Sequence, residues 1–87
     1  MPKSELSIRL LELLGGVENI EEVSNCKTRI RATLFDVDKA DIENIKALDG
    51  VIGVVKFGNQ YQVVLGDKTS EIADLFINRL KIRSGNK

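Results

Sequence analysis

Histidine and tryptophan are absent from this 87-residue sequence, and it holds a single cysteine. Without histidine a Ser-His-Asp triad cannot be built, and one thiol without histidine cannot form a zinc site. One cysteine also excludes an internal disulfide and a Cys-x-x-Cys redox pair, which favours a reducing compartment. Covalent chemistry must therefore come from Cys26, carboxylates, hydroxyls, lysines and arginines.

An excess of charge is also lacking, since thirteen basic side chains balance thirteen acidic ones. This balance argues against gross electrostatic capture of nucleic acid or of an anionic membrane. No apolar run approaches the roughly 20 residues of a membrane-spanning helix. The N-terminus carries an early acid and no small-residue cleavage site, unlike a signal peptide. We therefore expect a soluble, intracellular chain without a cofactor, a metal or a nucleic-acid partner.

What the sequence does contain is ordinary globular composition, 43% hydrophobic and 30% charged. Its length suits one modest hydrophobic core. We expect a single domain over residues 1–87, with a core at about residues 4–80 and a polar tail or linker at 81–87.

The first half of the chain predicts one helix and two strands. Apolar spacing predicts a helix over residues 4–14, capped by Ser4 and ended by Gly15-Gly16. A short strand is predicted over residues 19–25. Strict alternation predicts a second strand over residues 28–34. Its apolar face holds Ile30, Ala32 and Leu34, and its polar face holds Arg29, Arg31 and Thr33.

The second half predicts a helix, two strands and a further helix. Capping candidates over residues 36–41 and an apolar stripe ending at Asp49-Gly50 predict a second helix. Residues 51–57 and 61–65 predict a hairpin that turns at Gly58-Asn59. A third helix follows, with four inward-facing residues: Ile72, Leu75, Phe76 and Leu80. The prediction is an α+β fold of order α-β-β-α-β-β-α, in which three helices cover one face of a four-stranded antiparallel sheet.

The candidate chemistry lies around Cys26, in the predicted turn between the first two strands. A lone cysteine is most often a small buried apolar residue, but the polar neighbours Asn25 and Lys27 argue for exposure here. Nearby cations and backbone N–H groups stabilise a thiolate, and the same groups suit a phosphate. Arg29 and Arg31 share one strand face and can clamp one tetrahedral anion together. Taken singly, each arginine also fits solvated surface charge.

The spacing disfavours a tyrosine-phosphatase loop. That loop needs an arginine six residues after its cysteine, and Ala32 occupies this position. The histidine that precedes the cysteine in such loops is missing as well.

Motifs along nearly the whole chain, roughly residues 5–80, together resemble the enzyme IIB domain of the bacterial sugar phosphotransferase system, glucose family. The motifs, in order, are Gly15-Gly16-Val17-Glu18-Asn19-Ile20, Cys26-Lys27-Thr28-Arg29-Ile30-Arg31, Asp36, Gly50-Val51 and Gln60-Tyr61-Gln62-Val63-Val64-Leu65-Gly66. The one departure within the cysteine motif is Ile30, where the family usually has leucine. This position is on the core face and should not disturb the chemistry.

The resemblance implies a four-stranded antiparallel sheet with three helices on one face, and a role in phosphoryl transfer. Cys26 would accept a phosphoryl group from a phosphohistidine of a IIA domain. It would pass the group to a sugar held by the membrane-embedded IIC domain, at the inner face of the cell membrane. Arg29 and Arg31 match the family's two arginines, which matter for the transfer to sugar. We expect the isolated domain to be a monomer.

Three further expectations concern the surroundings of the cysteine. Thr28 and the backbone amides of Lys27 and Thr28 are expected to hold the phosphate. Asp36 fits a turn or cap at least as well as a site residue. Gln60, Tyr61 and Gln62 are expected either to border a docking surface or to be ordinary sheet surface.

The main alternative is a small αβ-sandwich module with a regulatory or RNA-binding role and the open sheet as its contact face. RNA readers of this kind display paired aromatic side chains on their central strands, and this chain has only three phenylalanines and one tyrosine. A non-catalytic regulatory relative that retains the cysteine is harder to distinguish.

Overall fold

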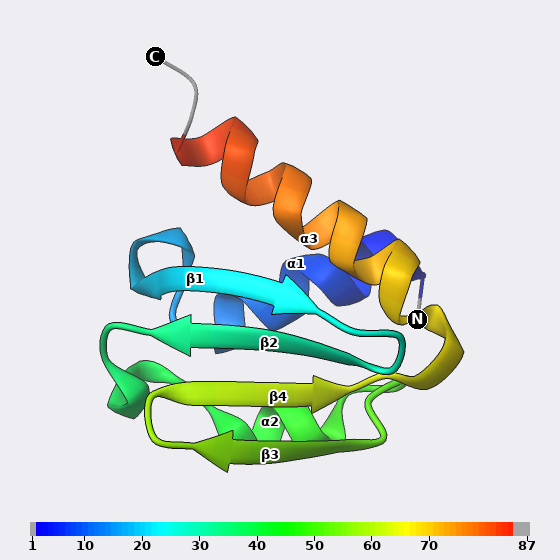
Figure 1. The fold of residues 1–87 in the computed structure, drawn as a ribbon, viewed down its shortest axis with the longest axis horizontal. Coiled ribbons are helices and arrows are strands. Elements are labelled where there is room, and N and C mark those ends of the chain that lie inside the picture. The colour runs from blue at the N-terminus through cyan, green and yellow to red at the C-terminus, as the bar shows by residue number, and fades with distance from the viewer. Residues whose placement is uncertain (1, 85–87) are drawn as a thin grey trace.

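The computed structural model describes residues 2–84 and has two layers, a sheet and a group of helices (Figure 1). The helices are apolar along one side, and apolar and polar side chains alternate along the strands. The helices are α1 (Lys3–Leu13), α2 (Ile42–Ala47) and α3 (Thr69–Ser84). The strands are β1 (Ile20–Asn25), β2 (Arg29–Leu34), β3 (Gly53–Phe57) and β4 (Gln60–Val64). The predicted α+β class and the order α-β-β-α-β-β-α are confirmed.

The sheet joins its two hairpins through their second strands. The strand order is β1-β2-β4-β3, and each neighbouring pair is antiparallel. Strands β2 and β4 therefore lie side by side in the middle, with Arg31 opposite Gln62 and Ile30 opposite Val63. The β1–β2 turn, the end of β4 and the start of β3 all lie at one end of the sheet (Figure 1).

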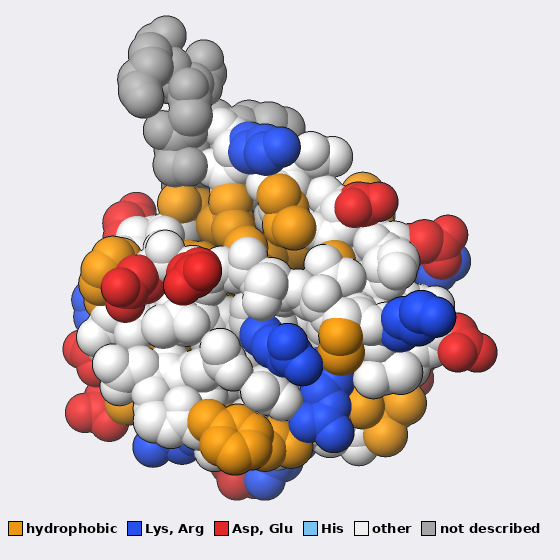
Figure 2. Space-filling view, in the orientation of Figure 1, with side chains coloured by type: hydrophobic (Ala, Val, Ile, Leu, Met, Phe, Trp, Pro, Cys, Tyr) orange, Lys and Arg blue, Asp and Glu red, His pale blue; other side chains and the backbone are white. Residues whose placement is uncertain are grey.

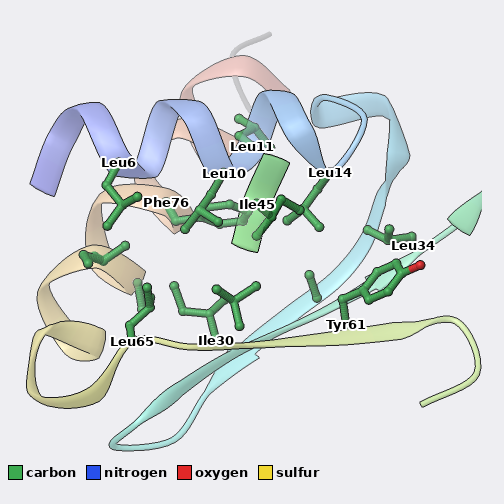
Figure 3. Packing of buried hydrophobic residues seen from close by; sticks show 14 residues of the cluster. Leu6, Leu10, Leu11, Leu14, Ile30, Leu34, Ile45, Tyr61, Leu65 and Phe76 are labelled. Carbon is green, nitrogen blue, oxygen red and sulfur yellow. The ribbon is translucent and has the colours of Figure 1, made fainter. Parts of the chain in front are cut away.

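The core lies between the sheet and the helices, as the alternation in β2 predicts. Its strand side chains meet α1 and α3, and the largest buried members include Leu6, Leu10, Ile30, Leu34, Ile72 and Phe76. In α3, Leu80 is partly buried against this cluster, whereas Leu75 is half exposed and Ala73 is buried in addition. Figure 3 shows the sheet residues Ile30 and Tyr61 pointing toward the helices.

Tyr61 corrects one expectation, because it is buried in the core and does not border the open face. It shares the inward alternation of Val63 and Leu65, both of which are buried too. The neighbouring residues Gln60 and Gln62 do lie on the opposite, open side of β4, where their partners on β2 are Thr33 and Arg31.

The start of α1 differs from the prediction. Pro2 occupies the cap position, with the helix running from Lys3, so Ser4 is not the cap. Proline presets the backbone φ angle at a helix start, which allows the helix to begin one residue earlier. The helix ends before Gly15 and Gly16, whose φ angles of 109° and 88° are unfavourable for other residues.

The predicted capping region before α2 contains two aspartate caps. Asp36 accepts a hydrogen bond from the backbone N–H of Asp38 at 3.0 Å, and Asp41 accepts one from Asn44 at 3.2 Å. Asp36 thus lies in a turn beyond the end of β2 that is opposite to the cysteine turn, which supports its structural role. At the other end of the chain, α3 continues to Ser84, so the expected tail at 81–87 begins as helix. Residues 85–87 of that tail lie outside the described residues.

Among residues 2–84, no helix combines the length and the apolar character needed to cross a bilayer.

Candidate functional site

Cys26 follows β1 in the turn that leads into β2. Its backbone N–H donates to the carbonyl oxygen of Arg29 at 3.0 Å, which closes the turn. The carbonyl oxygen of Thr28 accepts hydrogen bonds from the N–H groups of Leu65 and Gly66, at 2.9 and 3.1 Å. The turn that carries the thiol is therefore attached at both sides, to its own hairpin and to the end of β4.

The Cys26 thiol is partly exposed, and its surroundings lower its pKa. The largest cause is a hydrogen bond from the backbone N–H of Thr28, and partial burial of the sulfur opposes it. The N–H of Arg29, the hydroxyl of Thr28 and the positive charge of Arg31 lower the pKa further. The Thr28 Oγ1 lies 3.9 Å from the sulfur. These groups favour the thiolate, which is the reactive form of cysteine.

Of the two predicted phosphate ligands, Thr28 and Lys27, only Thr28 contacts the sulfur in the structure. Thr28 contacts the sulfur through both its amide and its hydroxyl. The second amide beside the sulfur belongs to Arg29, whereas the expectation named Lys27, which is exposed in the turn. A phosphate role for Thr28 and Lys27 stays a prediction.

The side chains of Arg29 and Arg31 lie on the open face of β2, opposite Val64 and Gln62 of β4. Arg29 Nη1 donates to Gln62 Oε1 at 2.8 Å, so its guanidinium is held over the sheet. The Nε atom of Arg31 is buried and has no hydrogen-bond partner among the described residues. A buried donor of this kind has a strong tendency to bind an acceptor.

The open face combines positive charge with exposed apolar side chains. Figure 2 shows Lys and Arg side chains grouped over the middle of the sheet, with hydrophobic side chains beside them and acidic ones further out. The exposed large hydrophobic residues include Ile52, just before β3, and Phe57, at the end of β3, with exposed fractions of 72% and 59%. Such a surface is typical of a protein docking site for a partner with acidic groups.

The hydrogen bond between Arg29 and Gln62 is the part of the site that sequence reasoning missed. The sequence grouped Gln60, Tyr61 and Gln62 on one surface, but the contact depends on the pairing of β2 with β4, which joins strands from different hairpins. The described residues contain no group of three or more His, Cys, Asp or Glu side chains that could hold a metal ion.

Comparison with known proteins shows a related family in the same part of the chain. A family model described as "phosphotransferase system, EIIB" matches residues 8–41, which include Cys26, Arg29 and Arg31. The MurNAc-GlcNAc-specific EIIBC component of the phosphotransferase system from Staphylococcus saprophyticus is 41% identical over 64 residues, 74% of this chain and 13% of that protein. The sucrose-specific EIIBC component from Bacillus subtilis is 42% identical over 66 residues, 76% of this chain and 14% of that protein.

A solved structure supports the fold independently. One domain of a phosphotransferase-system IIabc component from Clostridium difficile superposes with a TM-score of 0.75 at 23% identity, covering 94% of this chain and 82% of that one. The curated relatives are much longer than this chain, which spans only 13% and 14% of the two named above. The matched cysteine motif, the sequence identity and the shared fold lead to one assignment: the chain belongs to the EIIB domains of the phosphotransferase system.

Proposed function

We propose that this domain is a phosphoryl carrier in sugar uptake, with Cys26 as the residue that holds the phosphoryl group. The observation that carries the proposal is the thiol whose pKa is lowered by the Thr28 and Arg29 amides, next to two arginines on the adjacent strand face. Phosphoryl transfer asks a protein mainly for positioning and charge stabilisation, and this cluster supplies both.

In the loading step, the Cys26 thiolate attacks the phosphorus of a phosphohistidine on a IIA domain. An S–P bond forms as the N–P bond breaks, and the electron pair of that bond returns to the imidazole nitrogen. The thiolate needs no base, because it is already deprotonated when it attacks. The Thr28 hydroxyl and the turn amides would bind the phosphoryl oxygens that arrive beside the sulfur.

In the delivery step, a sugar hydroxyl oxygen attacks the same phosphorus. An O–P bond forms, the S–P bond breaks, and the hydroxyl proton passes to a base of the membrane domain that holds the sugar. A lowered thiol pKa assists this step too, since a thiolate of low pKa is the better leaving group. Arg29 and Arg31 would stabilise the charge on the equatorial oxygens during delivery.

The names of the relatives join the B component to a C component, which supports a IIC partner. We propose that this chain works with a IIC membrane domain that holds the sugar, at the cytoplasmic face of the membrane, and with a separate or linked IIA donor. The exposed Ile52 and Phe57 beside the basic centre of the open face suit docking of such a donor. The isolated domain would be a monomer.

The test is incubation with phosphoenolpyruvate, the general phosphotransfer proteins and a cognate IIA domain. Intact mass spectrometry should show the gain of one phosphoryl group, which disappears when the IIA domain is omitted. A regulatory relative that merely retains the cysteine would gain none with the same donor.

A further inference from the structure

Gln62 is a nearly buried polar side chain on the otherwise open face of the sheet, with 9% of its surface exposed. Both ends of its amide are used. Oε1 accepts from Arg29 Nη1 at 2.8 Å, and Nε2 donates to Gln60 Oε1 at 2.9 Å. A buried amide needs such partners on both ends, so the row Gln60, Gln62 and Arg29 is a connected network across β4 and β2.

The network has a fixed direction. A guanidinium only donates, so the oxygen of Gln62 must face Arg29. The Gln60 oxygen accepts from the amide nitrogen at the other end and thereby holds Gln62 in this orientation. Arg29 is in this way restrained before any ligand arrives, and its remaining N–H groups stay available for phosphoryl oxygens.

The neighbouring arginine has a different environment. Arg31 lies opposite Gln62 in the strand register, yet the contact to Gln62 is made by Arg29, and the buried Arg31 Nε has no partner among the described residues. The two arginines are therefore arranged unequally: Arg29 is fixed by a protein acceptor, and Arg31 keeps a donor that no described protein atom occupies.

We propose that Gln62 is a positioning residue for phosphoryl transfer, which acts by holding the Arg29 guanidinium in place during delivery to the sugar. The proposal rests on the proposed function and deepens it, because it names the group that orients one of the two arginines. Preorganised donors lower a barrier because they need no reorganisation as charge develops.

The test uses Gln62→Met, which keeps the length and bulk of the side chain but removes the acceptor. We expect loading by the IIA domain to stay near the wild-type rate. The kcat of transfer to sugar, measured with membrane vesicles that carry the IIC component, should fall about tenfold, the typical value of one hydrogen bond to a charged group. Thr33→Ala, a change on the same open face of β2, is the matched control and should leave both rates unchanged.

A double-mutant cycle separates positioning from general damage. In an Arg29→Ala background, Gln62→Met should cause no further loss, because its effect passes through Arg29. In the free protein, NMR should show slowed exchange of the Arg29 Nη protons that is lost in Gln62→Met and kept in Thr33→Ala.

The outcomes distinguish a failure of the Gln62 proposal from a failure of the proposed carrier function. Full additivity in the cycle, a wild-type kcat in Gln62→Met, or an unchanged Arg29 NMR signature would overturn the role of Gln62 while leaving the carrier function intact. A wild-type chain that loads no phosphoryl group would instead overturn the proposed function, and the NMR experiment would still report on the contact itself. If Gln62→Met unfolds, Gln60→Met, which releases only the amide end, replaces it with a smaller expected loss.

Discussion

The carbonyl oxygen of Thr28 accepts a hydrogen bond from the backbone N–H of Leu65 at 2.9 Å, which ties the cysteine turn to the end of β4. Leu65 is itself buried in the core. The turn that carries the thiol is thus attached to the buried core, which favours a fixed position for its amides around the sulfur. Preorganised amides of this kind explain a shifted thiol pKa without any neighbouring histidine.

The pH dependence of Cys26 reactivity follows from these amides. The pKa of the thiol lies below its usual value, so the thiolate persists to lower pH in the folded chain than in the unfolded one. Alkylation by iodoacetamide should therefore keep its rate to lower pH in the native protein, and should be lost as the pH falls through the folded pKa. The same chain in denaturant is the control, and equal midpoints would contradict this explanation.

The hydroxyl of Thr28 contributes less than its amide. Thr28→Val removes the contact between Oγ1 and the sulfur but keeps the backbone N–H, which is the largest cause of the lowered pKa. We expect the alkylation midpoint to rise only part of the way to that of the unfolded chain. A complete return would mean that the amide does not hold the sulfur.

The two arginines should differ in their effect on the thiol. The charge of Arg31 lowers the pKa of Cys26, whereas Arg29 acts through its backbone N–H. Arg31→Gln should therefore raise the alkylation midpoint, and Arg29→Gln, which keeps its amide, should leave it close to the wild-type value. The pair is a matched comparison, and equal shifts would refute the distinction.

Loading and delivery should separate in the lysine variants. Arg29→Lys and Arg31→Lys keep the charge but lose the planar fork that binds two oxygens at once. We expect Cys26 to load from the IIA domain and transfer to sugar to be impaired, as measured by phosphosugar formation. Equal loss of both steps would place the arginines in loading or in folding.

Asn19 supports the fold from the far end of β1. It is buried, donates to the carbonyl oxygens of Leu14 and Asp36 at 2.8 and 2.9 Å, and accepts from the Asp36 N–H at 2.9 Å. Asn19→Ala leaves these groups unpaired and should lower the free energy of unfolding by about 3 kcal/mol. Urea denaturation measures this, and a loss below about 1 kcal/mol would show that water replaces the side chain. Below the unfolding transition, the alkylation midpoint of Cys26 should not change.

The sequence predicted the local features of this domain better than its long-range contacts. Alternation correctly placed Ile30, Ala32 and Leu34 in the core, because a strand with one buried face repeats every two residues. The same rule, applied to residues 60–65, puts Tyr61 inside, whereas the prediction had grouped it with Gln60 and Gln62 at the surface.

The contact between Arg29 and Gln62 could not be predicted in this way. It depends on β2 and β4 being neighbours, and no local pattern specifies which strands of two hairpins pair. The position of the Arg29 amide beside the sulfur could not be predicted either, because the turn geometry decides which N–H groups face the sulfur. The candidate residues of the site were therefore predicted from their motif and their roles stay predictions, whereas the contacts between them required the structure.

The central claim is that the phosphoryl group resides on Cys26. After loading by phosphoenolpyruvate, the general proteins and a IIA domain, peptide mapping by mass spectrometry should place one phosphoryl group on the peptide that contains Cys26, and Cys26→Ser should carry none. Phosphoryl groups found on another residue, or a Cys26→Ser chain that loads as well as the wild type, would contradict the account.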